Sequence, residues 1–193
     1  MSKPLMRNVA GRSGSSLMRA PEIDALCNLL TSQLLQSTTM LEVGSYEGVT
    51  TSVIAERCPQ STIVSIDPFI EHDEFDIGRR HGPDRIANWL RNKRRNQHLW
   101  TGTLRDFYSF SNCNFNVVLI DGGHDYNSVR SDLAYASTMI LPDSVIAVHD
   151  YQECDGISWA GVTKATDDFI GEHLFVISEI VESLALLRKV TSK

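Results

Sequence analysis

Short apolar runs alternate with stretches of helical periodicity along most of this chain. Five apolar runs predict strands, at residues 39–43, 62–66, 98–101, 116–120 and 144–148. Apolar residues recur at helical spacing between them, at 48–57, from Pro83 onward, through Val129 and Leu133, and at 161–170. This alternation is typical of a parallel sheet whose strands are joined by crossover helices. The pattern therefore predicts an α/β fold.

The two ends of the chain depart from this alternation. Residues 1–19 place several basic residues among small polar ones, which predicts a flexible N-terminal arm. Pro21 then suits the first turn of a helix that continues to about residue 36. Two apolar runs at 173–177 and 183–190 predict a β-rich end, with strands that pair in an antiparallel way at one edge. We expect residues 20–193 to form a single domain.

Composition limits the partners and the cellular location that we expect for the protein. The chain has 193 residues, 42% of them hydrophobic, with a net charge of −6 and a pI near 5.5. This charge disfavours nucleic acid and anionic membranes as partners. There is no apolar signal segment, and the four cysteines (Cys27, Cys58, Cys113 and Cys154) lack the spacing of a metal or disulfide framework. We therefore expect a soluble cytoplasmic protein with reduced thiols.

Acidic residues stand at the ends of four predicted strands. Glu42 lies inside the first strand, and Asp67, Asp121 and Asp150 follow three others. An acid at one such position is as readily explained by a helix cap or a turn. In an open parallel sheet, however, the carboxyl ends of the strands meet at the edge where ligands bind. Four acids in corresponding places predict a ligand site there.

The glycines after the first strand indicate the kind of ligand. A dinucleotide fold needs a GxGxxG pattern, but Tyr46 and Val49 stand where its second and third glycines would be. This disfavours a nicotinamide-dependent reductase. The spacing of Gly44 and Gly48, with Glu42 before them, suits a ligand that carries an ammonium and a carboxylate instead of phosphates. Asp67 is placed to accept hydrogen bonds from ribose hydroxyls.

These motifs support a specific resemblance. Residues from about 38 to 170 resemble the class I S-adenosylmethionine (SAM)-dependent methyltransferases, and within them the small-molecule O-methyltransferase-like group called methyltransferase family 24. The matching segments are 41–51, 66–68, 119–126, 147–151, and Gly161-Val162 with the residues that follow. The resemblance implies a Rossmann-like three-layer sandwich, with a seven-stranded, mostly parallel sheet whose last strand is antiparallel.

The resemblance also implies roles for individual residues. Glu42, Gly44 and Gly48 would contact the methionyl part of SAM, and Asp67 its ribose. Thr103 and Leu104 would lie beside the adenine, although a turn and a core position explain them equally well. Asp121 and His124 would line the floor near the methyl group. The full set of expected cofactor-binding residues is Glu42, Gly44, Ser45, Tyr46, Gly48, Asp67, Pro68, Thr103, Leu104, Asp121, Gly122 and His124.

Methyl transfer is an in-line displacement, so the protein mainly has to align the acceptor with the methyl group. A hydroxyl acceptor must also lose its proton, to a base or with the help of a metal. His124 and His149 are the candidate bases, and Asp121 completes the expected catalytic set. Asp121, His149 and Asp150 are alternatively a candidate site for a divalent cation such as Mg²⁺, although His149 departs from the acidic pair that magnesium prefers.

The leading functional hypothesis is O-methylation of a small hydroxylated metabolite or sugar. The alternative is a catalytically inactive SAM-binding or regulatory module that keeps the nucleoside pocket. The segment from Phe69 to Gly82 is either a lid over the acceptor or a solvated loop. The first helix is amphipathic and can serve a homodimer. No motif in the chain identifies the acceptor.

Overall fold

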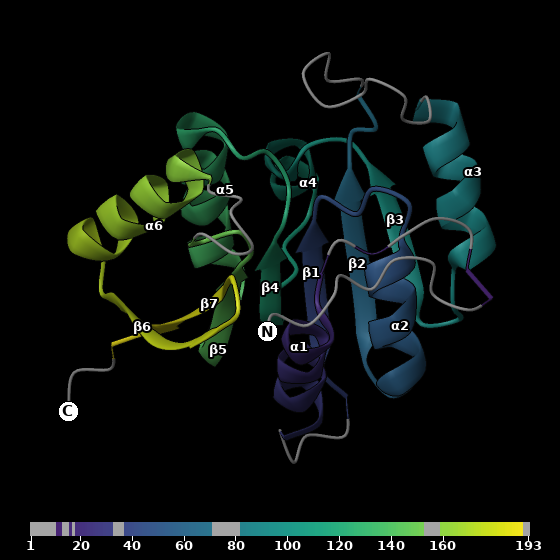
Figure 1. Ribbon diagram of the computed structural model, residues 1–193, viewed down its shortest axis with the longest axis horizontal. Helices are drawn as coiled ribbons and strands as arrows, with labels where there is room; N and C mark the ends of the chain where they lie inside the picture. Colours follow the sequence, from purple (N-terminus) through teal and green to yellow (C-terminus); the bar gives the residue numbers. More distant parts are fainter. Residues whose placement is uncertain are drawn as a thin grey trace.

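The computed structural model describes residues 11–12, 16, 18–32, 37–70, 82–152 and 159–190. They form a seven-stranded sheet with the order β3-β2-β1-β4-β5-β7-β6, flanked by helices (Figure 1). The strands are β1 (Thr39–Val43), β2 (Thr62–Asp67), β3 (Gln97–Thr101), β4 (Phe115–Ile120), β5 (Ile140–Val148), β6 (Phe175–Val181) and β7 (Leu184–Lys189). The helices are α1 (Ala20–Ser32), α2 (Val49–Arg57), α3 (Gly82–Asn92), α4 (Leu104–Phe110), α5 (Tyr126–Met139) and α6 (Ala160–Glu172).

The sheet confirms the predicted fold class. Strands β3, β2, β1, β4 and β5 are parallel to one another, so their carboxyl ends share one edge. Strand β7 is antiparallel to both β5 and β6, because the β6–β7 hairpin inserts its second strand next to β5. The predicted β-rich end therefore forms the antiparallel part of the sheet.

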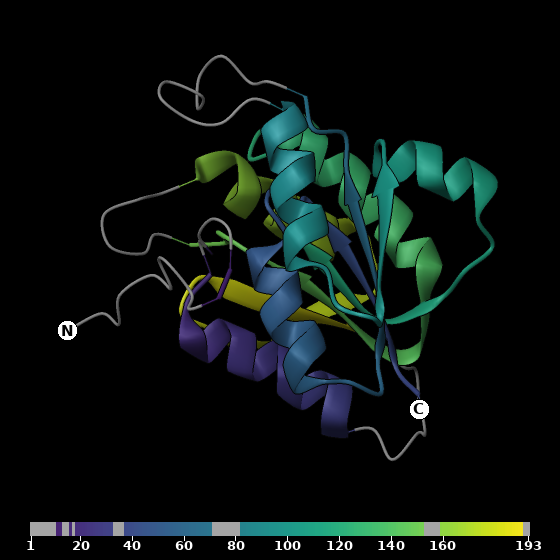
Figure 2. The same cartoon turned by 90° about the vertical axis from the view of Figure 1, so that its right-hand side faces the viewer.

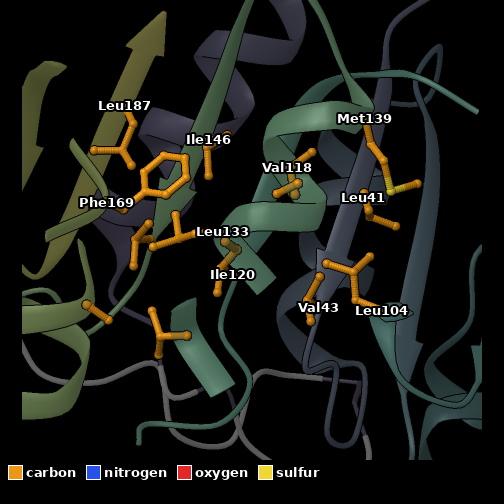
Figure 3. Close-up of a cluster of buried hydrophobic side chains, with 14 of the residues drawn as sticks. Leu41, Val43, Leu104, Val118, Ile120, Leu133, Met139, Ile146, Phe169 and Leu187 are labelled. Atoms are coloured by element: carbon orange, nitrogen blue, oxygen red, sulfur yellow. The ribbon is translucent and has the colours of Figure 1, made fainter. Parts of the chain in front are cut away.

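Alternating side chains on the strands build a core on each face of the sheet. In β1, Leu41 and Val43 point to the face covered by α4, α5 and α6 (Figure 3). Met40 points to the opposite face, where α1 and α2 pack. Figure 2 shows these helices on the two sides of the sheet. The two-residue period of a strand thus produces the three layers.

Three elements differ most from the sequence prediction. Strand β6 starts two residues later and ends four residues later than the run predicted at 173–177. Helix α4 was not expected, because its seven residues are too short to show a clear apolar period. It begins with a capping box, in which Thr103 accepts from the Asp106 amide and Asp106 accepts from the Thr103 amide. Strand β5 starts four residues earlier than expected, and its pairing with β4 shifts register between Phe115 and Val117.

Part of the segment expected to be a flexible arm is packed against the domain. Met18 is fully buried and Arg19 nearly so, while Arg12 donates to Ser52 at 2.7 Å. The remaining residues of that segment (1–10, 13–15 and 17) lie outside the described residues. Among the helices that the structure describes, none combines the length and apolar composition needed to cross a bilayer.

Candidate functional site

The loop between β1 and α2, residues 44–48, lies at the carboxyl edge of the sheet and requires both of its glycines. Gly44 has a φ of +88°, and a Cβ there would lie 2.2 Å from the carbonyl oxygen of Asp121. Gly48 has a φ of +69°, and a Cβ there would lie 2.5 Å from Cδ1 of Trp89. Left-handed backbone and close approach together explain why glycine occupies both positions.

Helix α3 holds this loop in place. Asn88 Nδ2 donates to Glu47 Oε1, and Asn92 Nδ2 donates to the Glu47 carbonyl oxygen, both at 2.8 Å. The Arg85 guanidinium lies 5.6 Å from the centre of the Tyr46 ring. Sequence reasoning missed Asn88 and Asn92, because polar residues in a helix give no sign of which loop they reach.

Glu42 lies deep beneath the loop, with only 1% of its surface exposed. Its Oε2 accepts hydrogen bonds from the hydroxyl groups of Thr51 and Ser65. Burial raises the pKa of the Glu42 carboxyl to about 8, and the nearby charges of Asp121 and Asp67 act in the same direction. A cation bound beside Glu42 would offset the free-energy cost of ionising this buried carboxyl.

Asp67 at the end of β2 is already engaged with the loop. Its Oδ2 accepts from the amides of Ser45 at 3.0 Å and Tyr46 at 2.7 Å, and its Oδ1 accepts from the Phe69 amide at 2.7 Å. Burial raises the pKa of Asp67, and these amide hydrogen bonds partly offset the rise. A carboxylate offers about four acceptor positions, so this one keeps about one for a ribose hydroxyl.

The remaining expected cofactor residues lie in varied surroundings. Pro68 is exposed next to Asp67. Thr103 caps α4, and Leu104 is a core residue packed between α4 and the sheet. Leu104 thus has the core position that the sequence allowed for it, whereas Thr103 caps a helix where a turn was the alternative. The contact of both residues with adenine stays a prediction. Most of the segment expected as a lid, at 71–81, lies outside the described residues.

Side chains from the ends of β4 and β5 form a compact cluster beside the loop. Nε2 of His124 lies 3.0 Å from Oδ2 of Asp150, and Nδ1 of His149 lies 2.9 Å from Oδ1 of Asp121. His124 also stacks on Trp159, with the ring centres 4.3 Å apart. Asp121, Gly122, His124 and His149 line a small hollow whose apolar wall includes Val148 and Val162. The structure thus brings together four residues that the sequence placed at two separate strand ends.

His149 is the most enclosed member of this cluster, with 6% of its surface exposed. Nδ1 faces Asp121 and, at 3.3 Å, Asp150, while Nε2 lies 3.4 Å from Oε2 of Glu22. Burial alone would lower the pKa of His149, but the neighbouring carboxylates hold it well above the ordinary value. Hydrogen bonds from His124 and His149 in turn hold the pKa of Asp150 well below its ordinary value, against the effect of burial.

The two candidate bases are therefore not equivalent. A general base needs an unprotonated nitrogen within reach of the acceptor. Both ring nitrogens of His149 face carboxylates, whereas the side chain of His124 is 30% exposed. The geometry favours His124, and the role of either histidine stays a prediction.

Three residues are arranged to share a cation. One ligand atom each from Asp121, His124 and Asp150 lie within 4.8 Å of one another. The set expected from the sequence contained His149 in place of His124. Because the ring nitrogens of His149 already face Asp121, Asp150 and Glu22, His124 is the better placed imidazole. Sequence reasoning also missed Glu22, since an acid in the first turn of a helix is ordinarily explained by the helix dipole.

Solved structures similar in fold include three O-methyltransferases or methyltransferases of biosynthetic pathways. The O-methyltransferase TomG from Streptomyces achromogenes, involved in tomaymycin synthesis and solved with SAM, has a TM-score of 0.59 and 17% identity over 91% of this chain and 82% of its own. CalS11, a TDP-rhamnose 3'-O-methyltransferase of calicheamicin biosynthesis, has a TM-score of 0.55 and 16% identity over 86% and 76%. MycE, a methyltransferase of the mycinamycin pathway solved with Mg and S-adenosylhomocysteine, has a TM-score of 0.56 and 15% identity over 86% and 49%.

These identities are low, so the likeness shows the fold alone. A search of curated proteins finds no significant match to the sequence. A comparison with family models does find one: residues 41–151 match methyltransferase family 24, described as a methyltransferase domain. The matched segment covers more than half of the chain and includes the loop at 44–48, Asp67, Asp121 and Asp150. The protein therefore belongs to methyltransferase family 24 and is a methyltransferase enzyme.

Proposed function

We propose that the protein transfers the methyl group of SAM to a hydroxyl group of a small hydroxylated metabolite or sugar. The observation that carries this proposal is a juxtaposition at one edge of the sheet. The loop at 44–48 and Asp67 lie at the ends of β1 and β2, and the cluster of Asp121, His124 and Asp150 lies at the ends of the neighbouring strands β4 and β5. A ligand held by the loop would have its reactive end at the cluster.

Features of the loop support SAM as that ligand. Within the described part of the chain, the buried Ser45 Oγ of the loop and Trp89 Nε1 of the adjacent helix α3 have no hydrogen-bond partner, so the surroundings of the loop offer polar groups to a ligand. Glu42 provides a buried carboxyl whose raised pKa favours a cationic neighbour such as an ammonium group. Tyr46 and Glu47 make the loop unsuited to a pyrophosphate.

The chemistry required of the protein is alignment and proton removal. SAM supplies an electrophilic methyl carbon on a positively charged sulfur, and the acceptor oxygen bonds to that carbon as the carbon–sulfur bond breaks. The loop and the cluster hold the two reactants in line. We assign removal of the acceptor proton to the imidazole of His124, because this is the more exposed of the two candidate histidines. Since Nε2 of His124 donates to Asp150, the nitrogen that would accept the proton is Nδ1.

The cluster also suits a divalent cation, and we propose Asp121, His124 and Asp150 as its ligands. Two carboxylates and one imidazole fit Mn²⁺ or Fe²⁺ as well as Mg²⁺. A cation there would acidify the acceptor hydroxyl. His124 would then be a ligand and not the base, so the two roles are alternatives. MycE was solved with Mg, which makes Mg²⁺ the first cation to test.

Calorimetry with S-adenosylhomocysteine tests the proposed cofactor. We expect the wild-type protein to bind it and Asp67→Ala to bind it at least about tenfold more weakly, because loss of one charged hydrogen-bonding group costs on the order of 1.5–3 kcal/mol. Asp24→Ala is the control, since Asp24 is an exposed acid paired with Arg57. Absence of binding to the wild-type protein would contradict the proposal.

Turnover tests the proposed class of acceptor. A panel of sugars, phenols and other hydroxylated acceptors should include at least one that is methylated, with and without added Mg²⁺ or Mn²⁺. Cofactor binding without transfer to any of these acceptors would contradict the proposed acceptor class. The cytoplasmic location and the homodimer stay predictions.

A further inference from the structure

Helix α1 reaches the floor of the candidate site through one side chain. Glu22 lies in the first turn of α1 and is fully buried. Its carboxylate lies between the N-terminus of α1, the turn of the β6–β7 hairpin and the end of β5. A buried acid at such a meeting point needs specific partners, because an unpaired buried charge is strongly destabilising.

The Glu22 carboxylate faces hydrogen-bond donors from three parts of the fold. Oε2 accepts from the Arg19 amide at 2.6 Å and faces Nε2 of His149 at 3.4 Å. Oε1 accepts from the amide and hydroxyl of Ser183, at 3.0 and 2.8 Å. Although burial opposes it, these contacts, led by that with His149, hold the pKa of Glu22 below its ordinary value. The site is built for an ionised carboxylate.

The hairpin turn is fixed to the same place by further contacts. The Tyr151 amide donates to the Ser183 carbonyl oxygen at 2.9 Å, and Arg19 pairs with Glu182 at 3.3 Å. Arg19 and the hairpin turn at 182–183 therefore form a frame that holds the Glu22 carboxylate on the side away from His149. A carboxylate held in this way can orient the imidazole that it faces.

The orientation of the His149 ring affects the candidate site because its second nitrogen, Nδ1, faces the cluster. Its Nδ1 faces Asp121 and Asp150, which are two members of the candidate methyl-transfer cluster. We propose that Glu22 is a positioning residue for this cluster: it holds Nε2 of His149 so that Nδ1 stays directed at Asp121 and Asp150. The role of Glu22 in catalysis rests on the proposed function, but the contact between Glu22 and His149 can be tested without turnover.

The first test is the spectrum of the histidine ring nitrogens by NMR. In the wild-type protein we expect a protected Nε2–H signal from His149, assigned by its loss in His149→Gln. Glu22→Ala should lose this signal. Glu22→Gln should retain the signal, because the amide oxygen of Gln can still accept from Nε2. The signal should be shifted, because the NH₂ group of Gln then faces the Ser183 amide, which is also a donor.

Two controls separate positioning from folding. Ser183→Ala removes a partner of Glu22 but leaves the contact with His149, so it should keep the wild-type ring signal. Asp24→Ala changes an exposed acid of the same helix and should also keep it. A folded Glu22→Ala protein with an unchanged Nε2–H signal would overturn the proposal. If that variant does not fold, a Glu22→Gln signal identical to the wild type would overturn it.

A second readout follows once an acceptor is found. We expect Glu22→Ala or Glu22→Gln to lower kcat on the order of ten- to hundredfold, the range found for groups that orient a functional histidine, with unchanged affinity for S-adenosylhomocysteine. An unchanged kcat would contradict the positioning role. If the wild-type protein binds no S-adenosylhomocysteine, the proposed function fails, whereas the ring spectra still decide whether Glu22 holds His149.

Discussion

Glu42 shows how a single buried group can serve binding at the expense of stability. Its carboxyl pKa is about 8 in the folded protein against a reference value of 4.5. For a carboxyl whose pKa is raised by folding, the folded state loses stability as pH rises from the lower value to the higher one. The ligand-free protein should therefore lose stability at this residue between about pH 4.5 and pH 8.

Glu42→Gln tests this relation. The amide keeps acceptors for Thr51 and Ser65 and removes the buried charge, so the variant should gain at least about 1 kcal/mol over the wild type at pH 8 relative to pH 5. It should also bind S-adenosylhomocysteine more weakly, because the ligand ammonium loses its counter-charge. Urea unfolding at both pH values and calorimetry measure the two effects. An equal pH dependence of stability in the wild type and the variant would refute the predicted effect of the Glu42 charge on stability.

Gly44 is constrained by both backbone conformation and space. Gly44→Ala should destabilise the protein by about 2–5 kcal/mol, since an L side chain is strained at positive φ and its Cβ would meet backbone of the β4–α5 loop. Gly171→Ala is the matched control. A Cβ there meets nothing within 4 Å, so within α6 it should be neutral or stabilising by up to about 1 kcal/mol. Thermal unfolding of the two variants gives the comparison.

At the scale of elements, α3 supports the loop at 44–48 from outside the sheet. Asn88→Ala removes the hydrogen bond to Glu47 and should cost about 1 kcal/mol of stability. We expect a larger effect on ligand binding, with the affinity for S-adenosylhomocysteine reduced about tenfold because the free loop becomes less ordered. Leu90→Ala alters an exposed residue of the same helix and should leave the affinity unchanged. Equal affinities of the two variants would argue against this support.

The contrast between β1 and α4 explains what the sequence could predict about the fold. Three of the five residues of β1 (Met40, Leu41 and Val43) are apolar, and this short run located the strand correctly. Helix α4 spans two turns, and its start depends on the capping box of Thr103 and Asp106. Such local hydrogen bonding carries no long period, so periodicity did not reveal the helix.

The same reasoning applies to the candidate site. Asp67, Asp121 and Asp150 follow strands, and the parallel sheet brings every strand end to one edge, so their proximity could be predicted. Glu22 and Asn88 lie on helices whose side-chain partners depend on tertiary packing. For His124 and His149, the strand pattern predicted positions at strand ends but not which of the two rings would be buried.

At the scale of the whole molecule, ligand binding should appear as added stability. A ligand present at about 100 times its Kd stabilises the folded state by about 2.7 kcal/mol. For a domain of this size, that corresponds to a rise in Tm of about 5–11 °C. Thermal shift with S-adenosylhomocysteine should show this rise, and NAD at the same concentration should not. A rise with NAD alone would revive the nicotinamide-dependent reductase.

The contact of Glu22 with Ser183 and His149 also bears on how the protein is made. Glu22 and Ser183 lie 161 positions apart in the chain, yet they meet beneath the same cluster. During synthesis the loop at 44–48 and Asp67 leave the ribosome early, whereas the turn that completes the frame of Glu22 emerges only after β6. A nascent chain therefore cannot complete the hydrogen bonds of Glu22 until the turn between β6 and β7 has been synthesised.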